Sequence, residues 1–456
     1  MSTNSPFYEV YNQKLSKEQK EFDGTLGAIS LMIFSHFIPF YFTLSLRYNS
    51  GGLYYPSSFN EFIENVQETY SPTWSACYLY MGFFLIQLIL AAILPGPEVK
   101  GLPVPTENNR QYTYKCNALT SWYLTLICIS VCHFTGIFRM TILADQSDSI
   151  LCVAVIFSDI LSIYSHLYAL KTNQTCRMTH SPIYDFFMGI WLNPRIRILG
   201  QDVDLKMIAE VRLSWLLLFL LIISAALKQY EIFHTITWPM IFILTAQILY
   251  INACMKGEEC IPVTWDIFYE KWGWMLIYWN LAGVPFVYAF QAYYILVNSL
   301  RTQKPNENIS MTFIIILFIV LIFAYYIWDS SPSQKIRFRM QQQGIYITRN
   351  GFPQVPWNEI KNPKYLKTEC GSPLLIDGYW KYCRKPAYAA DICMATCWAL
   401  SCHQWFGVLP YFYPIFFFFM IIHRYTRDMT RCQAKYGKDW ATYCKRVPYA
   451  FIPGVI

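Results

Sequence analysis

The residues best suited to chemistry lie in the last quarter of the chain, in two basic and aromatic clusters set between apolar runs. The first cluster reads GYWKYCRKPAYAAD from Gly378 to Asp391, and the second reads HRYTRDMTRCQAKYGKDWATYCKRVPY from His423 to Tyr449. Guanidinium and ammonium groups bind phosphate, and aromatic rings stack on planar ligands. The two clusters therefore predict a site for a large anionic ligand that carries flat rings.

The spacing in the first cluster suggests how these groups would be presented. Trp380, Arg384 and Tyr388 recur every four residues. On one helix they would form a single stripe that combines an indole, a guanidinium and a phenol. The alternative explanation is an aromatic belt at the membrane surface.

The second cluster predicts a helix that breaks at Gly437 and restarts. Arg424, Asp428 and Arg431 share one helical face before the break. A solvated amphipathic end helix would explain the charges but not the aromatic residues, so we favour a ligand site. These aromatic residues are Tyr436, Trp440 and Tyr443.

Lys335 and Arg339 are a further pair of cations four residues apart, and they share a face if the segment is helical. Two cations at this spacing could hold a pair of phosphates. Taken alone, a basic flank that follows a membrane span explains them more simply.

The composition indicates what must position these groups. Of 456 residues, 55% are hydrophobic and 14% are charged, whereas soluble proteins average roughly 25% charged residues. Long apolar runs with this deficit predict a polytopic membrane protein. The net charge of +7 is assigned to cytoplasmic loops and not to nucleic-acid binding.

The apolar runs predict an all-α bundle of about ten transmembrane helices. The last two, at about 389–402 and 408–422, are short and would pair as a hairpin. That pairing brings the Arg384 and Arg427 regions to one side of the membrane. The other runs are at about 26–46, 74–94, 118–142, 150–170, 211–227, 233–253, 274–296 and 311–328, the run at 274–296 being interrupted by Gly283 and Pro285.

No metal centre and no soluble nucleotide-binding motif is expected. The fifteen cysteines show no zinc-type spacing, and neither GxGxxG nor a P-loop pattern occurs. His36, His133 and His166 lie in or beside apolar spans. We interpret them as buried histidines with satisfied hydrogen bonds and not as metal ligands.

Both clusters resemble the sterol reductase family of the endoplasmic reticulum. The stretches that carry the resemblance are LLIDGYWKYCRKPAY, HRYTRDMTRCQAKYGKDWATY and VPYAFIPGVI. Further stretches, among them YDFFMGIWLNPRI and RNGFPQVPWNEIKNPKYL, are similar to the branch that reduces the sterol side chain, the delta-24(28) reductases of ergosterol synthesis. The resemblance covers essentially the whole chain from Glu21.

The resemblance implies NADPH as the cofactor, bound among the C-terminal helices. One departure concerns Ala387, because several family members have Asn there and its side-chain hydrogen bond cannot form. The cofactor residues expected from the clusters and the resemblance are Lys335, Arg339, Leu375, Trp380, Arg384, Tyr388, Arg427, Asp428, Cys432, Gln433, Ala434, Lys435, Tyr436 and Tyr443.

The implied reaction is reduction of the C24(28) double bond as the last step of ergosterol-type synthesis. Protonation at C28 would leave a tertiary cation at C24, which then accepts hydride. A buried acid that stays protonated suits the first step. The candidates are Tyr269, Glu270 and Asp266 in TWDIFYEK, and a loop salt bridge to Lys271 or Lys256 explains these residues equally well.

Three other functions remain open at this point. They are reduction of a ring double bond (delta-7 or delta-14), methyl transfer by an enzyme of the isoprenylcysteine type that uses S-adenosylmethionine, and sterol binding without catalysis. The expected partners are a sterol and membrane lipids in the endoplasmic reticulum membrane, and association with other sterol-synthesis enzymes is left open. The expected organisation is a polar tail at 1–25, a sterol-binding bundle at 26–330 and an NADPH-binding part at 331–456.

Overall fold

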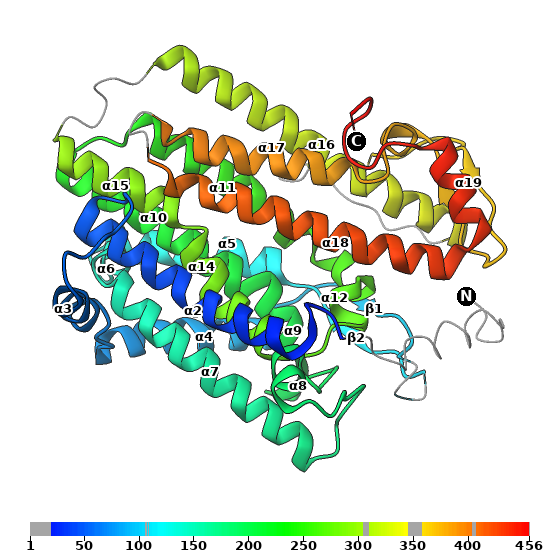
Figure 1. Cartoon of the computed structure of the whole chain (residues 1–456), viewed down its shortest axis with the longest axis horizontal. Helices are drawn as coiled ribbons and strands as arrows, with labels where there is room; N and C mark the ends of the chain where they lie inside the picture. Colours follow the sequence, from blue (N-terminus) through cyan, green and yellow to red (C-terminus); the bar gives the residue numbers. More distant parts are fainter. Residues whose placement is uncertain are drawn as a thin grey trace. The chain divides into compact units, whose positions relative to one another are not determined.

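The computed structural model describes residues 20–104, 107, 109–303, 310–344, 358–403 and 407–455. Over these residues the protein is predominantly helical, with three short two-stranded antiparallel sheets (Figure 1). The chain divides into a larger unit, residues 18–308 with 404–410, and a smaller unit that contains residues 309–403 and 411–456. The predicted class, an all-α polytopic membrane protein, is confirmed.

Long apolar helices form most of the larger unit. Helices satisfy their backbone hydrogen bonds internally, which is why apolar runs of this length fold as helices in lipid. Six helical stretches of this unit are long and apolar enough to cross a membrane. They contain α2 (Gly24–Asn49), α4 (Trp74–Ile93), α7 (Ser147–Lys171), α10 (Ser214–Phe233), α11 (Trp238–Lys256) and the broken helix that begins at Trp274.

The degree of burial distinguishes the central helices from the outer ones. The stretches Leu205–Phe233 and Trp274–Thr302 are each 83% buried over their most apolar window, whereas Gly24–Asn49 is 33% buried. Helix α10 packs against α11, α14 (Val284–Val287) and α15 (Phe290–Thr302). The outer helices expose apolar side chains, as expected for surfaces that face lipid.

The predicted interruption near Gly283 is confirmed. Helix α13 (Trp274–Tyr278) leads into a π-helical turn, Trp279–Gly283, before α14 begins. A Cβ atom at Gly283 would lie 2.2 Å from Cε3 of Trp279. Only glycine therefore fits beside the indole at this turn.

The span predictions hold in part. Among the described residues, seven helices meet the length and hydropathy of a membrane span, the seventh being Met311–Gln342. The predicted third span appears as the shorter helix α5 (Ala118–Phe134). The two predicted hairpin arms form helices, α17 (Pro386–Leu400) and α18 (Phe412–Tyr436), that are not among these seven.

Short polar elements lie between the spans of the larger unit. The strands β1 (Glu98–Lys100) and β2 (Thr113–Lys115) pair with each other, as do β3 (Arg195–Ile198) and β4 (Gln201–Asp204). A 3-10 helix, Gly257–Val263, joins α11 to α12. The remaining helices of the unit are α3 (Phe59–Thr69), α6 (Ile142–Asp145), α8 (Pro182–Met188), α9 (Leu205–Ile208) followed by a π-helical turn at Ala209–Leu213, and α12 (Trp265–Phe268).

The smaller unit consists of α16 (Met311–Gln343), which packs on α17, and α18, which also packs on α17. Between α16 and α17 lie the paired strands β5 (Tyr365–Leu366) and β6 (Leu374–Leu375) and a 3-10 turn, Gly378–Lys381. The predicted break at Gly437 is confirmed, because α18 ends at Tyr436 and α19 (Lys438–Arg446) follows. Gly437 has a φ of 53°, which favours glycine.

Candidate functional site

An ion pair between Lys385 and Asp428 joins the two C-terminal helices. The Nζ atom of Lys385 lies 2.5 Å from Oδ2 of Asp428. Lys385 precedes α17, which begins with Pro386, and Asp428 lies on α18. The predicted pairing of the last two helices is therefore confirmed, since the start of α17 meets the later half of α18, and the side of the membrane stays a prediction.

The charge state of this pair follows from its surroundings. Burial would raise the pKa of Asp428, but the ammonium of Lys385, with Lys335 and Arg431, holds it below its ordinary value. Burial would lower the pKa of Lys385, but Asp428 holds it above its ordinary value. Both groups are therefore ionised around neutral pH.

Several basic side chains surround Asp428. The charges of Lys335, Lys385 and Arg431 stabilise the ionised carboxylate of Asp428. Arg339 is close enough to Lys335 for the two side chains to repel each other. We call these five residues the Asp428 cluster. Basic side chains gathered around one carboxylate suit a site that binds an anion.

The Lys335 side chain also lies against an aromatic surface. Its Nζ atom is 4.5 Å from the ring centroid of Trp380. The indole N–H of Trp380 donates to the carbonyl oxygen of Ser331 at 2.9 Å. Trp380 packs with Phe338 and Leu375. Leu375 and Trp380, both predicted site residues, are thus held beside the predicted cation.

The predicted stripe of Trp380, Arg384 and Tyr388 on one helix is wrong. Trp380 lies in the 3-10 turn, Arg384 lies in the connection, and only Tyr388 lies in α17. The reason is Pro386, which suits the first turn of a helix and prevents a longer one from running through it.

Arg384 binds the C-terminal tail. One Nη atom donates to the carbonyl oxygens of Val447 and Pro448, at 2.9 Å and 2.8 Å, and the other donates to the hydroxyl of Tyr425 at 2.7 Å. The amide of Arg384 also donates to the carbonyl of Tyr449 at 2.9 Å. Arg384 therefore positions the tail beside α18, and a role in phosphate binding stays a prediction.

We expect Arg384→Lys to lower the stability of the protein. Lysine keeps the charge but loses the planar fork that reaches three oxygens, and hydrogen bonds to charged groups contribute about 1.5–3 kcal/mol each. The measurement is the thermal unfolding midpoint in detergent. The control is Arg446→Lys at an exposed arginine of α19, and equal midpoints in both variants would contradict the prediction.

The remaining predicted residues lie at the end of α18 and on α19. Cys432, Tyr436 and Tyr443 pack in one cluster with Trp440. The ring of Trp440 stacks on those of Tyr436 and Tyr443, with centroids 6.0 Å and 5.1 Å apart. Cys432 reaches Oδ2 of Asp428 at 3.8 Å. The aromatic run is thus connected to the Asp428 cluster through Cys432.

Other predicted residues nearby have simpler surroundings. The carbonyl of Gln433 accepts from the amide of Gly437 at 3.0 Å, and Nζ of Lys435 lies 4.9 Å from the ring centroid of Tyr436. Ala434 is exposed on α18. Tyr388 packs near Phe451, with ring centroids 6.2 Å apart. Arg427 lies close enough to His423 to lower the pKa of that histidine, after the larger effect of burial.

Lys385 is the site residue that the sequence analysis missed. It stands beside Arg384 in a run of cations, and its position directly before Pro386 could have indicated that it lies at the start of a helix. A residue just before a helix-starting proline is held near the helix end, where it can reach a neighbouring helix.

The candidate proton donors lie in the larger unit, in and after α12. The buried ammonium of Lys206 donates to the carbonyl oxygens of Asp266, Ile267 and Glu270, at 3.2 Å, 2.5 Å and 2.8 Å. The guanidinium of Arg177 lies 3.8 Å from the ring centroid of Tyr269. The segment is therefore fixed by two cations, and Glu270 is buried.

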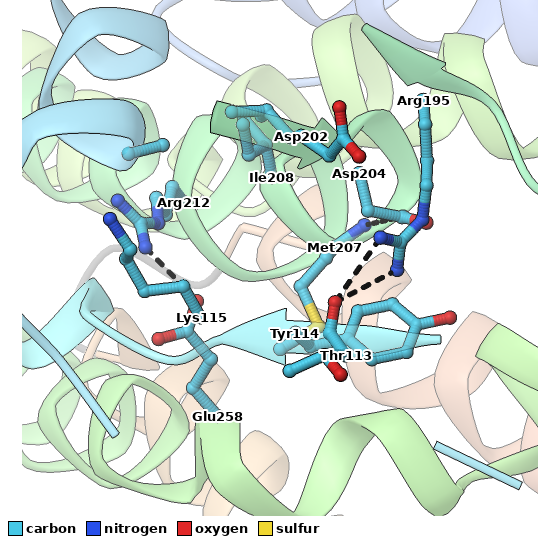
Figure 2. Close-up of a pocket in the computed structure, with 12 residues that line it drawn as sticks. Thr113, Tyr114, Lys115, Arg195, Asp202, Asp204, Met207, Ile208, Arg212 and Glu258 are labelled. Carbon is cyan, nitrogen blue, oxygen red and sulfur yellow. Dashed lines mark hydrogen bonds and ion pairs between the residues drawn. The ribbon is translucent and has the colours of Figure 1, made fainter. Parts of the chain in front are cut away.

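The larger unit also contains a polar pocket that the sequence did not indicate. Figure 2 shows Arg195 and Asp204 on one side of it and Arg212 and Glu258 on the other. Glu258 accepts from Arg212 at 3.2 Å and from the amide of Ala118 at 2.6 Å. The lining carries Lys115, Arg195 and Arg212 against Asp202, Asp204 and Glu258, so its charges balance.

Comparison with known proteins places this chain in a family. The model of the ergosterol biosynthesis ERG4/ERG24 family matches residues 16–456. The chain is 38% identical to the Delta(24(24(1)))-sterol reductase erg4A of Aspergillus fumigatus, over 96% of this chain and 93% of that protein. A Delta(24(24(1)))-sterol reductase of Gibberella zeae is also 38% identical, over 96% of this chain and 73% of that protein. The Delta(14)-sterol reductase of Dictyostelium discoideum is 35% identical, over 98% and 96%.

Proposed function

Because the chain belongs to the ERG4/ERG24 family of sterol reductases, we propose that it reduces the C24(28) double bond of a sterol side chain with NADPH. Two relatives named for the delta-24(24(1)) position support this choice of double bond. We further propose the endoplasmic reticulum membrane as its location, with a sterol and membrane lipids as its partners.

The observation that carries the cofactor proposal is the Asp428 cluster. The basic side chains of Lys335, Arg339, Lys385 and Arg431 gathered around Asp428 suit a dinucleotide with several phosphates. The half-buried ring of Tyr436 offers a surface for planar groups, and the buried rings of Trp380 and Tyr443 support the site. We propose that the cations hold the phosphates and that Asp428 holds Lys385 in place. NADPH, when bound, supplies the hydride.

The protein's own part in the reaction is to supply a proton and to exclude water. Protonation of the methylidene carbon C28 creates a tertiary cation at C24, where hydride is then accepted. Tyr269, Glu270 and Asp266 remain proposed donors. Loss of the true donor lowers kcat and leaves the KM for NADPH unchanged, so Tyr269→Phe tests the first of them.

Reduction of a ring double bond is the second candidate. Delta(14)-sterol reductases are 35% and 33% identical to this chain, nearly as similar as the side-chain reductases. The two substrates share the same chemistry and differ in which part of the sterol reaches the reacting groups.

One experiment separates these functions. Purified protein with NADPH is offered sterols unsaturated at C24(28), C14 or C7, and the products are identified by mass spectrometry. A mass gain of two hydrogens on the C24(28) sterol alone supports the proposal. Gain on the C14 sterol alone would replace it by the second candidate, and no gain on any sterol would refute a reductase.

We expect Tyr443→Phe to lower kcat by about 10-fold or more. Tyr443 is buried among aromatic rings, and burial raises the pKa of its hydroxyl, so the group stays a neutral hydrogen-bond donor. We propose that this hydroxyl donates to the bound cofactor, and the loss of one such hydrogen bond costs about 1–3 kcal/mol. Steady-state kinetics provide the measurement, with Tyr449→Phe as the control at an exposed position. Unchanged kinetics in Tyr443→Phe would remove its hydroxyl from the site.

A further inference from the structure

Helix α3 (Phe59–Thr69) lies on the surface of the larger unit, in the connection between the spans α2 and α4 (Figure 1). Of its 11 residues, only Thr69 is buried. A helix this short is marginally stable in water on its own. Its start is fixed, because Oγ of Ser58 accepts from the amide of Glu61 at 3.1 Å and Oε2 of Glu61 accepts from the amide of Ser57 at 2.7 Å. Most of its surface, however, is not packed against the protein.

The side chains of α3 divide among three faces. Apolar residues recur at the spacing of a single helix face, and we call them the apolar face of α3: Phe59, Phe62, Ile63 and Val66. A second face carries Asn65 and Glu68 and contacts the protein. The third face is polar and exposed, and it carries Asn60, Glu64 and Gln67. Because each residue turns the helix by about 100°, the three faces lie about 120° apart.

The apolar face of α3 is largely uncovered. Phe59 is 74% exposed and Ile63 is 36% exposed. In the segment that leads into the helix, Tyr55 and Leu53 are 78% and 40% exposed, respectively. The rings of Phe59 and Phe62 lie side by side, with centroids 6.5 Å apart. Large apolar side chains gathered on one exposed face mark an interaction surface for a protein or a membrane.

Contacts with α2 place the end of α3 at the level where that span ends. Oε1 of Glu68 lies 2.5 Å from Nη2 of Arg47, and Oε2 accepts from the hydroxyl of Tyr48 at 3.0 Å. Arg47 and Tyr48 belong to the last turn of α2. The hydroxyl of Tyr70, directly after α3, donates to the carbonyl oxygen of Phe40 at 2.6 Å. Phe40 precedes the last residue of α2 by nine residues, about 14 Å along the helix. The C-terminal end of α3 therefore lies beside the last turns of α2 and not beyond them.

The start of α4 marks the same boundary. Trp74 and Tyr78, in its first turns, are 79% and 75% exposed, and these residue types are enriched where a span meets the membrane surface. Only residues 70–73 separate α3 from α4, so α3 ends within about 18 Å of Trp74. The guanidinium of Arg47, which also reaches Asp148 at 3.3 Å, keeps this level close to water. The helix is thus held at the boundary between hydrocarbon and water, beside the lipid-facing aromatic residues of α4.

We propose that α3 is an interfacial helix that anchors the connection between the first two spans to the bilayer surface. Its apolar face enters the boundary of the acyl chains, and Asn60, Glu64 and Gln67 face water. Such helices bury their apolar side by about 5–10 Å. The partner is a surface of neutral phospholipid, because α3 has three glutamates and no basic residue. Anionic headgroups therefore add no attraction.

The first test is photochemical crosslinking of the whole chain in phosphatidylcholine liposomes. Phe59→p-benzoylphenylalanine and Ile63→p-benzoylphenylalanine place the reactive group on the apolar face. The same substitution at Glu64 or Gln67 is the matched control on the exposed polar face. After illumination, mass spectrometry should find lipid adducts at positions 59 and 63 with a yield about 10-fold above that at 64 and 67. Addition of phosphatidylserine should leave these yields unchanged.

The second test measures how firmly lipid holds the helix. The double variant Phe59→Ser with Ile63→Ser removes the two exposed apolar side chains, and the control is Asn60→Ser with Gln67→Ser. In liposomes, hydrogen exchange of the α3 amides should become about 10-fold faster or more in the first variant, because burial of large apolar side chains in lipid is lost. Exchange should stay within about 3-fold of wild type in the control. The amides of α2 and α4 should be unaffected in both.

Equal lipid adducts at all four positions would overturn the proposal, because the apolar face would then have no preferred contact with the bilayer. Adducts to a second copy of the chain in place of lipid would assign the face to a protein contact instead. Higher yields with phosphatidylserine would exclude a neutral surface as the preferred partner. Wild-type exchange of the α3 amides in the double variant Phe59→Ser with Ile63→Ser would show that lipid does not hold the helix.

Discussion

Replacing Asp428 with alanine is expected to lower kcat/KM for NADPH by about 100-fold or more. The carboxylate holds Nζ of Lys385 at 2.5 Å and is the negative group among the cations of the Asp428 cluster. Truncating one partner of a buried, hydrogen-bonded charge pair costs about 2–5 kcal/mol, and each 1.4 kcal/mol is a factor of ten. Without Asp428 the cations repel one another and lose their fixed arrangement.

The measurement is NADPH oxidation that depends on sterol, together with NADPH binding by calorimetry. The control is Asp439→Asn at the start of α19, where asparagine keeps the acceptor for the amide of Glu369. Normal binding and turnover in Asp428→Ala would move the cofactor site away from α18. A loss of binding without loss of the thermal midpoint would support the site directly.

The pH dependence of this pair has a defined direction. The pKa of Asp428 lies below its ordinary value because of Lys385 and the other cations. The ionised carboxylate therefore stabilises the cluster above about pH 4, and this stabilisation is lost as the pH falls through the lowered pKa. The pKa of Lys385 lies above its ordinary value, so its contribution is lost only as the pH rises through that raised pKa. Both members of the pair should therefore stay ionised between about pH 5 and 9, and the pair should not change the NADPH affinity in that range.

Replacing Glu258 with alanine is expected to destabilise the larger unit by about 3–5 kcal/mol, the usual cost of breaking a buried ion pair. The side chains of Glu258 and Arg212 are 3% and 2% exposed, respectively. Without the carboxylate, Arg212 keeps a buried charge with only Asn117 as a described hydrogen-bond acceptor. The amide of Ala118 at the start of α5 loses its acceptor as well.

The thermal unfolding midpoint in detergent measures this effect. The control is Glu259→Ala at the neighbouring, less buried glutamate, which should lower the midpoint much less. Glu258→Gln should lie between the two, because the amide keeps an acceptor but not the charge. Equal midpoints for Glu258→Ala and Glu259→Ala would contradict the importance of the Arg212 pair.

Local features of the sequence determined much of the fold. Apolar runs long enough to cross lipid predicted the helices, because only internal hydrogen bonding satisfies a backbone there. Gly437 predicted the break between α18 and α19, and Gly283 and Pro285 predicted the interruption after α13. The cations and rings of the C-terminal clusters also suggested a ligand class, an anion with flat rings, and this stays a prediction.

The error in the first cluster also has a local cause. Four-residue spacing predicted one helical face for Trp380, Arg384 and Tyr388, but Pro386 starts a new helix between them. A four-residue spacing places side chains on one face only within one continuous helix. Pro386 begins a new helix, so the three residues do not share a face.

Only the tertiary structure decided which side chains meet. Lys385 and Asp428 are 43 residues apart, Arg384 and Val447 are 63 apart, and His36 and Asp159 are 123 apart. Apolar periodicity shows that a helix is buried, but not which neighbour its polar residue faces. The packing of α17 on α18 and of α2 beside α7 fixes those pairings. For this reason the sequence predicted a ligand site in the C-terminal part, whereas the structure was needed to show which charged residues pair with each other.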